Sequence, residues 1–326
     1  MFYKNARIFA SDCRFHQGAF EVTDDGRFGQ ILPDRIPEDA YDLEGAMVIP
    51  GLVDVHTHGN SDYDFSDGDY EGLKQMARCY LLSGVTSFAP ASMTQTYDVL
   101  EKAYDTARRM VEEDPAGCAK LRGIHMEGPY FSYKKRGAQN PVYLKDPDFE
   151  GFRKLNEISG DLIRIVDVAP ELPGALEFIR KASKFCTVSV AHTDATYEQA
   201  KAAFGAGASH LTHMFNGMNA IDHRSPGVIP AAAEAPHVRA ELICQGMCRH
   251  RHPPEAVGGL VHPGPAEFRR RQQDLLRCRL PEAAAVRGIR QGPHPAAEAQ
   301  PQGGSAEAVQ GLHRTLPELL HGLLRS

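Results

Sequence analysis

The sequence lacks the marks of several protein classes. Its 326 residues include seven cysteines, and no two of them form a CxxC pair. Without an even disulfide framework, reduced thiols and a cytoplasmic protein are expected. No apolar run approaches the roughly 18 residues that a membrane-spanning helix needs, and the first residues show no basic-plus-apolar signal pattern. We therefore expect no membrane partner.

The last quarter of the chain lacks residue types that the rest contains. Residues 247–326 have no lysine, asparagine or tyrosine and one isoleucine, but eleven arginines, nine prolines and nine glycines. Such a composition is poor material for a buried sheet. We interpret residues 247–326 as an aberrant tail, either disordered or read from a shifted frame. The encoding DNA, translated in its other frames past residue 244, tests this interpretation.

Charge is unevenly distributed along the chain. The whole chain has a formal charge of −6. Residues 1–246 hold 25 basic and 35 acidic side chains and so carry −10, whereas residues 247–326 carry +4. An acidic main part argues against a nucleic-acid partner, because phosphate backbones are bound by basic surfaces.

Two kinds of pattern divide the first 246 residues. Residues 1–46 contain short alternating segments separated by turn residues, which predict a small, incomplete β layer. From residue 47 to 246, strand-like runs alternate with helical patterns, which is typical of a parallel sheet with crossover helices. The predicted strands cover 47–55, 84–90, 121–126, 162–168, 186–191, 208–212 and 238–244. The expected fold is an α/β barrel of the TIM type that lacks its eighth strand.

Helix starts are predicted at two capping boxes. Ser92 with Gln95, and Thr196 with Gln199, have the spacing in which each side chain bonds the other's backbone amide. We expect a helix to begin after Ser92, and another to run from Thr196 to Gly205.

Polar side chains of metal-binding type follow four of the predicted strands. They are His56, His58, Glu127, His192 and His213. The carboxyl ends of barrel strands meet at one face, so these side chains should converge there. Imidazole and carboxylate are the expected ligands of Zn²⁺ or a similar divalent ion. A His₂Glu set with open coordination positions is typical of a catalytic zinc site.

Each of these residues also has an ordinary explanation. His56 and His58 could be polar residues at the start of a loop, and Glu127 could be a solvated loop glutamate. We expect His125 to face the other side of its strand as a packing histidine. The repetition of the pattern at four strand ends favours the metal site.

The order of the motifs resembles a known family. HxH, GxHxEGP, a strand-end histidine, and THxFNxM followed by Arg and Pro-Gly are similar to N-acetylglucosamine-6-phosphate deacetylase, in the amidohydrolase superfamily. The resemblance covers about residues 5–246. It implies a barrel of the metal-dependent hydrolase kind. It also implies that a metal-activated water hydrolyses the acetamide of N-acetylglucosamine 6-phosphate to glucosamine 6-phosphate and acetate.

The resemblance also implies roles for individual residues. A primary divalent ion, with zinc expected, would be held by Glu127, His192 and His213, and a second ion by His56 and His58. The amino-sugar phosphate would be bound by Ala138, Gln139, Asn216, Gly217 and Arg224. Arg224 would take the phosphate, because a guanidinium binds phosphate bidentately. Many family members have histidine where this chain has Gln139.

Two features of the family are missing. The family has an Asp-Gly-x-His segment where this chain reads Gln245, Gly246, Met247 and Cys248. It also has an aspartate at the end of strand eight that serves as general base and acid, whereas the tail has only Asp274, in a different context. We assign no catalytic aspartate. The chain as written is therefore expected to have little deacetylase activity and, with two open strand edges, low stability.

Two other functions stay open. The chain could be an inactive remnant that still binds metal or sugar phosphate, or another amidohydrolase acting on a cyclic amide or an amino-purine. In each case the partner is a small molecule, and a homodimer is compatible with the sequence.

Overall fold

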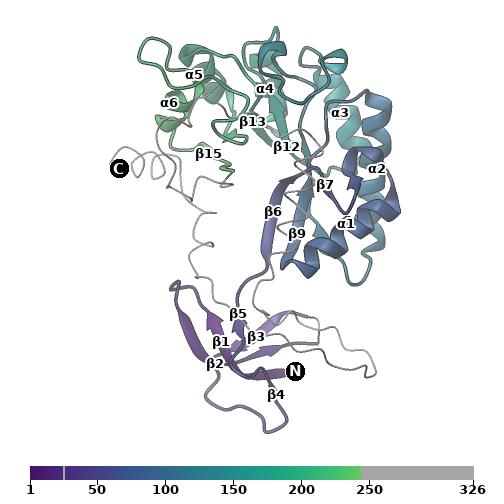
Figure 1. The fold of residues 1–326 in the computed structure, drawn as a ribbon, viewed down its shortest axis with the longest axis vertical. Coiled ribbons are helices and arrows are strands. Elements are labelled where there is room, and N and C mark those ends of the chain that lie inside the picture. Colours follow the sequence, from purple (N-terminus) through teal and green to yellow (C-terminus); the bar gives the residue numbers. More distant parts are fainter. Residues whose placement is uncertain (25, 244–326) are drawn as a thin grey trace. The chain divides into compact units, whose positions relative to one another are not determined.

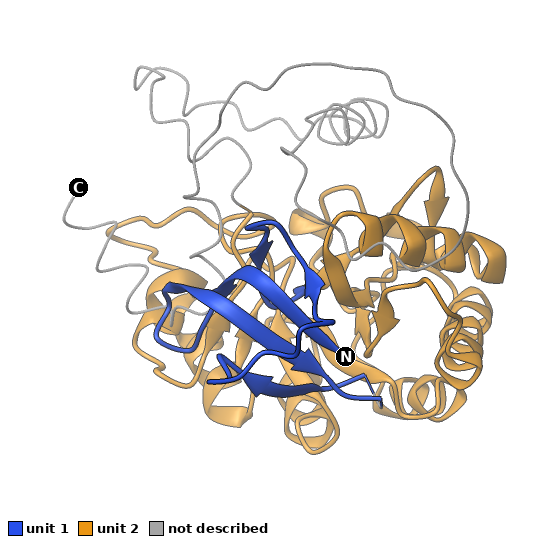
Figure 2. Cartoon of the chain, turned by 90° about the horizontal axis from the view of Figure 1, so that it is seen from below, with its two compact units in different colours: residues 1–52, 263–304 blue, residues 53–262, 305–326 orange. Residues whose placement is uncertain are grey.

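The computed structural model describes residues 1–24 and 26–243 (Figure 1). They fall into two compact units, residues 1–52 and residues 53–243, drawn blue and orange in Figure 2. The tail 247–326, with Asp274, lies outside the described residues, as does the end of the seventh predicted strand. No helix in the described part has the length and apolar composition that crossing a membrane requires.

The first unit is a β layer, as the alternating segments predict. Its strands are β1 (Phe2–Phe9), β2 (Phe15–Val22), β3 (Phe28–Ile31), β4 (Tyr41–Asp42) and β5 (Met47–Val48). They follow the order β3-β2-β1-β4, with β5 also paired to β1. Ala6, Ile8 and Phe20 form its small core. Because β5 pairs with β1, this unit extends past the predicted boundary at residue 46.

The second unit alternates strands and helices. Its longer strands are β6 (Leu52–Thr57), β9 (Val85–Pro90), β11 (Ile124–Met126), β12 (Ile163–Val168) and β13 (Thr187–Val190), and the shorter ones are β7 (Gly59–Asn60), β8 (Tyr63–Asp64), β10 (Lys120–Leu121), β14 (His210–Leu211) and β15 (Arg239–Ala240). The α-helices are α1 (Tyr70–Leu82), α2 (Tyr97–Glu113), α3 (Phe149–Ile158), α4 (Ala175–Ala182), α5 (Tyr197–Ala206) and α6 (Val228–Ala233). Three 3₁₀ turns, Phe65–Asp67, Tyr133–Lys135 and Pro141–Tyr143, complete the set. The predicted α/β alternation is confirmed.

The strands of this unit form two main sheets. One has the order β10-β9-β6, and the other is the parallel sheet β11-β12-β13-β14-β15. A bridge between Ala91 and His125 joins them. The predicted strand 47–55 is wrong at its start, because Pro50 and Gly51 separate β5 from β6, and proline supplies no ladder donor. The predicted strand 121–126 is divided, since β10 pairs with β9 and β11 with β12.

Helices cover the sheets and bury a continuous core. Met76 and Ala77 of α1, Tyr104 of α2 and Phe88 of β9 are fully buried together. Figure 1 shows α1, α2 and α3 on one side of strands β6, β9 and β12. This packing leaves the opposite, inward side of the strands for the polar residues described below.

One of the two predicted capping boxes forms. At Thr196 the side chain accepts the amide of Gln199 at 3.2 Å, and the Gln199 carboxamide accepts the amide of Thr196 at 2.9 Å. Helix α5 then ends at Ala206 with Gly207 as its C-cap, not at Gly205. The prediction at Ser92 is wrong. Its hydroxyl is buried and bonds the Tyr104 hydroxyl at 2.9 Å, and helix α2 begins only after Thr96.

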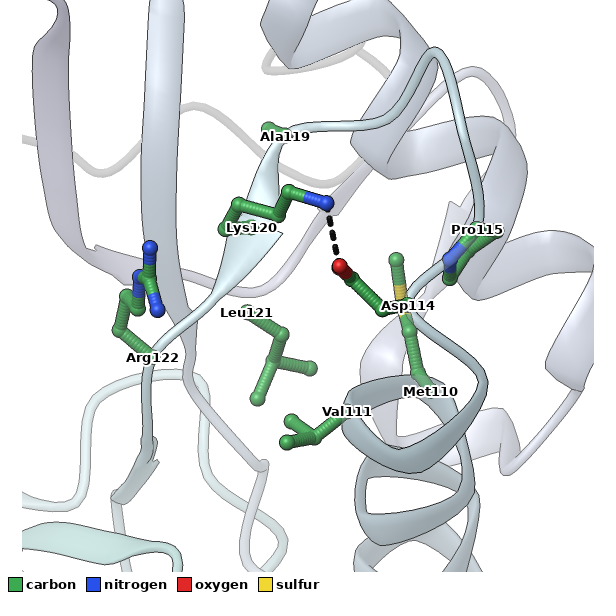
Figure 3. Close-up of a pocket in the computed structure, with 8 residues that line it drawn as sticks. All are labelled: Met110, Val111, Asp114, Pro115, Ala119, Lys120, Leu121 and Arg122. Atoms are coloured by element: carbon green, nitrogen blue, oxygen red, sulfur yellow. Dashed lines mark hydrogen bonds and ion pairs between the residues drawn. The ribbon is translucent and has the colours of Figure 1, made fainter. Parts of the chain in front are cut away.

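A shallow hollow lies where α2 ends beside β10 (Figure 3). It is lined by Met110, Val111, Asp114, Pro115, Ala119, Lys120, Leu121 and Arg122. Its charged groups include the ion pair between Lys120 and Asp114. None of the predicted ligands lines this hollow, so the predicted metal site lies elsewhere in the unit.

The capping box at Thr196 predicts a stability change. Thr196→Ala removes the side-chain acceptor and should lower the free energy of unfolding by about 1 kcal/mol. Urea unfolding followed by circular dichroism measures this. Thr96→Ala is the matched control, because Thr96 caps α2 without a side-chain bond to the helix backbone. Equal losses in the two variants would contradict the prediction.

Candidate metal centre

The five predicted ligands come together around one carboxylate. Oxygen Oε1 of Glu127 lies 3.1 Å from Nε2 of His192, 3.2 Å from Nε2 of His213 and 3.7 Å from Nε2 of His56. Oxygen Oε2 lies 3.0 Å from Nε2 of His58. Each residue stands at or just after the carboxyl end of β6, β11, β13 or β14, so parallel strands bring them to one place. Glu127 is only 2% exposed.

The same ring nitrogen of each histidine faces the carboxylate. Nδ1 of His192 donates to the carbonyl of Lys135 at 2.8 Å, and Nδ1 of His58 donates to the carbonyl of Ala91 at 3.1 Å. Donation from Nδ1 leaves the lone pair of a neutral ring on Nε2. These rings are thus held in the tautomer that a metal ion requires.

The protonation of these groups follows from burial and from each other. Burial alone would raise the pKa of Glu127, but the imidazoles of His58, His192, His213 and His56 outweigh it and hold that pKa well below its usual value. Burial would lower the pKa of His192, yet its hydrogen bond with Glu127 raises that pKa overall.

The donor set fits a divalent ion. Nε2 of His192 and Nε2 of His213 are 3.1 Å apart, and two lone pairs at that distance require a proton or a cation between them. Glu127, His192 and His213 form one potential metal-holding group, and His56, His58 and Glu127 form a second. Two groups that share a carboxylate can hold two ions.

Two of these ligands have unusual backbone conformations. His192 has φ +43° and His213 has φ +32°, in the left-handed region. Such a conformation costs of order 1–3 kcal/mol for a non-glycine residue and persists only where surrounding contacts enforce it. The left-handed residues follow β13 and β14, where the backbone must turn so that each histidine ring faces Glu127.

Gln139 lies at the metal centre, although the sequence predicted it to bind sugar. It is 4% exposed, its Nε2 donates to Oε2 of Glu127 at 2.9 Å, and its Oε1 accepts the amide of Thr94 at 2.7 Å. Both ends of the carboxamide are therefore engaged in holding the carboxylate. Gln139 thus orients the carboxylate of Glu127 in this structure.

Gly217 is shaped by close approach to a ligand. It has φ +63°, and a Cβ there would lie 3.0 Å from Nδ1 of His192. Its carbonyl accepts the amide of Thr193 at 2.8 Å. Glycine is needed here because the backbone lies against the ring.

The other predicted substrate residues lie on more exposed segments. Asn216 is half-buried beside Gly217, and Ala138 and Arg224 are exposed. In the part of the chain that the structure describes, no carboxylate pairs with the guanidinium of Arg224. Only its amide bonds Asp222, at 2.8 Å.

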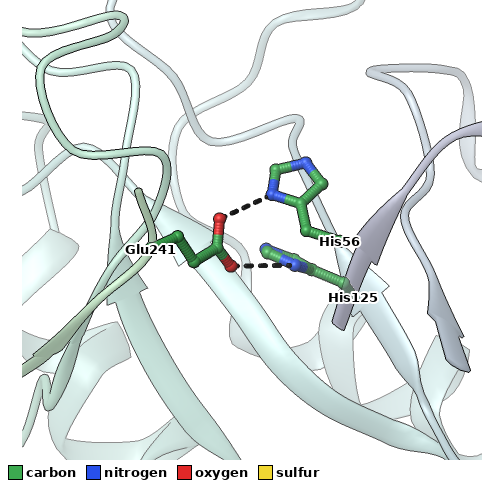
Figure 4. A group of neighbouring side chains, drawn as sticks. All are labelled: His56, His125 and Glu241. Carbon is green, nitrogen blue, oxygen red and sulfur yellow. Dashed lines mark hydrogen bonds and ion pairs between the residues drawn. The ribbon is translucent and has the colours of Figure 1, made fainter. Parts of the chain in front are cut away.

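His125 corrects an expectation about side-chain direction. It lies on the same side of its strand as Glu127, since residues two apart share a face. It is fully buried, with Nε2 2.9 Å from Asp167 and Nδ1 3.2 Å from the carbonyl of Val55. Each ring nitrogen therefore lies within hydrogen-bond distance of an acceptor. His125 is a satisfied histidine, as predicted, but it lies inside the barrel next to His56 (Figure 4).

Glu241 is a site residue that the sequence analysis missed. It follows β15, is largely buried, and accepts from Nδ1 of His56 at 2.7 Å (Figure 4). Burial would raise its pKa, but the His56 hydrogen bond and the nearby histidines lower that pKa to about 2. A glutamate within the otherwise largely apolar predicted strand 238–244 was the available signal.

Comparison with known proteins agrees with this geometry. A family model described as Amidohydrolase family matches residues 47–256. The chain belongs to this family. Members generally use a divalent metal ion, in agreement with the histidine and glutamate groups found here. The resemblance inferred from the motifs is confirmed.

Individual relatives are named for one activity. N-acetylglucosamine-6-phosphate deacetylase of Bacillus subtilis is 35% identical over 237 residues, which cover 70% of this chain and 59% of that protein. The enzyme of Lysinibacillus sphaericus is 34% identical over 232 residues, covering 69% and 59%. Among solved structures, a variant of the Mycobacterium smegmatis deacetylase in complex with N-acetyl-D-glucosamine-6-phosphate has a TM-score of 0.68 at 29% identity, covering 84% of this chain and 67% of that one. The chain thus spans about 59% of the length of the two curated relatives.

The geometry predicts loss of metal on ligand removal. Glu127→Ala takes away the shared carboxylate and should abolish tight binding of every ion, whereas His192→Ala should remove the ion of the His192–His213 group. Elemental analysis of the purified proteins measures the metal content. His237→Ala is the control, because His237 is exposed and lies in neither group. Unchanged metal content in the Glu127 variant would refute the assignment.

Proposed function

We propose that this site hydrolyses the acetamide of N-acetylglucosamine 6-phosphate, releasing glucosamine 6-phosphate and acetate. The observation that carries the proposal is the convergence of four imidazole Nε2 atoms on the buried carboxylate of Glu127. The names and identities of the relatives support the choice of substrate. No observation favours a cyclic amide or an amino-purine.

Zinc is the ion that we propose for the site. Imidazole and carboxylate are its preferred ligands in hydrolases, and a His₂Glu set leaves coordination positions open. When bound, a divalent ion supplies Lewis acidity, which activates water and polarises the amide carbonyl. Glu127, His192 and His213 would hold the first ion, and His56 and His58 with Glu127 the second. Gln139 would keep the carboxylate in register through its carboxamide.

The substrate would be held by the segments beside the ligands. We propose that Ala138, Asn216 and Gly217 line the sugar site and that Arg224 binds the phosphate. The exposed guanidinium of Arg224, with no carboxylate partner among the described residues, supports this role, because an anionic ligand can bind it without displacing an ion pair.

A second candidate function is binding without turnover. It is favoured by one observation. Among the described carboxylates beside the ligands, Glu241 and Asp167 are each bonded to a histidine ring, and Asp54 accepts the backbone amide of His56 at 3.1 Å. None is a counterpart of the aspartate that the family uses as general base. On this reading, the chain binds metal and sugar phosphate as an inactive remnant.

We further propose that the chain as written lacks an eighth barrel strand. Within residues 53–243, β6 and β15 are the outer strands of their sheets, and Val53 and Val55 of β6 are 52% and 40% exposed. The composition of residues 247–326 supports a foreign or frame-shifted tail in place of that strand. A cytoplasmic location and a homodimer remain predictions.

One assay distinguishes the two candidate functions. The full chain, loaded with zinc, is mixed with N-acetylglucosamine 6-phosphate, and acetate release and binding heat are both measured. Acetate release at an ordinary enzymatic rate, on the order of 1–1,000 per second, supports the deacetylase. Binding without release supports the remnant. If the chain shows no binding and no acetate release, both candidate functions are refuted.

Arg224 predicts selectivity for the phosphorylated sugar. A charge-assisted bidentate contact contributes about 1.5–3 kcal/mol, so Arg224→Ala should weaken binding of the phosphorylated sugar about tenfold to a hundredfold. Binding of unphosphorylated N-acetylglucosamine should hardly change. Arg239→Ala, which alters an exposed arginine on β15, is the matched control. Equal losses for the two sugars would rule out the phosphate role.

A further inference from the structure

A layer of polar side chains lies beside the metal ligands, on strands that would normally face inward with apolar residues. Its members come from β6, β11, β12, β13, β14 and the residue after β15. They are His56, His125, Asp167, Ser189, His210, Thr212 and Glu241. All of them are buried or largely buried. Glu241 is the member with direct contacts to two of the ligand segments.

The first contact fixes the ring of His56. Oε2 of Glu241 accepts from Nδ1 of His56 at 2.7 Å, as Figure 4 shows. This bond does for His56 what the carbonyls of Lys135 and Ala91 do for His192 and His58. It leaves the Nε2 lone pair on the side of Glu127. Unlike those carbonyls, the acceptor carries a full negative charge, which strengthens the bond and makes the imidazole a better donor to a metal.

The second contact is with the backbone of another ligand. The same oxygen accepts the amide of His213 at 3.0 Å. His213 has φ +32°, which an L-residue adopts only when its surroundings enforce it. The carboxylate of Glu241 therefore ties the end of β6 to the left-handed turn after β14.

The rest of the layer lies near the other oxygen of Glu241, Oε1, which has no hydrogen-bond partner among the described residues. His210 lies with Nε2 3.9 Å from Oε1 of Glu241 and bonds Ser189 through Nδ1 at 2.9 Å. Ser189 bonds Thr212 at 2.7 Å, and Thr212 donates to Asp167 at 2.9 Å. Asp167 accepts from His125, whose Nδ1 lies 3.7 Å from Oε1 of Glu241. This series of contacts therefore begins and ends at Glu241.

We propose that Glu241 is a positioning residue of the metal centre. Its carboxylate sets the orientation of His56 and the turn at His213, so that their Nε2 atoms meet at Glu127. This inference rests on the metal site of the proposed function and extends it to a residue outside the ligand set. The ion held with His56 depends most on Glu241, because the bond reaches the ring itself.

The spacing of His56, His125 and Glu241 also matches a third potential metal group. Hydrogen bonding argues against it. The two nitrogens of His125 are already directed at other partners, the carboxylate of Asp167 at 2.9 Å and the carbonyl of Val55 at 3.2 Å. Nδ1 of His56 is directed at Glu241 itself. The group is therefore a support for the metal centre and not another ion site.

The test measures the affinity of each ion in the full chain by competition with a chelator. Glu241→Leu should weaken the ion held with His56 about 10- to 100-fold, the usual effect of losing the partner of a ligating histidine. Glu241→Gln keeps an acceptor oxygen and should retain most of that affinity. Glu234→Gln, at an exposed glutamate paired with Lys201, is the control and should leave both ions unchanged.

A double-mutant cycle separates positioning from general loss of structure. In a His56→Ala background, Glu241→Leu should cause little further loss of metal affinity, because the ring that Glu241 orients is already absent. Equal losses in the two backgrounds, or equal losses for Leu and Gln, would overturn the proposal. If the parent chain binds two ions and Glu241→Leu leaves their affinities unchanged, the positioning role of Glu241 is also refuted. In that case the proposed function still stands. A parent chain that binds no ion would refute both.

Discussion

The metal centre depends on the buried carboxylate of Glu127. At 2% exposure this group is held ionised by four imidazoles and one carboxamide, and its pKa lies well below the usual value despite the burial that would raise it. A buried charge without partners would cost several kcal/mol. The four strand ends must therefore arrive together, or the carboxylate cannot remain charged. A divalent ion between these rings would use the same arrangement.

The fold meets this requirement in two steps. Parallel strands bring their carboxyl ends to one face, which places the ligands in the same region. Their rings must then turn toward a single point, and at His192 and His213 this needs a left-handed backbone. The close approach of Gly217 to His192 and the bond from His213 to Glu241 hold those turns. Local strain is thus balanced by contacts from other strands.

Sequence patterns predicted the convergence of the five candidate ligands because each lies at or just after the end of an apolar run, where strand-end geometry decides its position. They failed where long-range contacts decide. Ser92 had capping-box spacing, yet a buried bond to Tyr104 engages its hydroxyl and the helix starts later. The bond from Gln139 to Glu127, twelve residues earlier, was likewise not predicted, and the sugar-binding role of Gln139 stays a prediction. Glu241 had no motif, since its partner His56 is 185 residues away.

The polar layer behind the ligands lowers the stability of the barrel interior unless its groups are paired. Apolar side chains there would stabilise the barrel interior, whereas charged and hydroxyl groups must each be paired to avoid a desolvation penalty. In the described chain, hydrogen bonds run from His125 through Asp167, Thr212 and Ser189 to His210, while Oδ2 of Asp167 and Oε1 of Glu241 have no hydrogen-bond partner. A network of this kind gives each member few alternative positions. Loss of one bond would loosen the rings that face Glu127, so residues that never touch the ion still govern how tightly it is held.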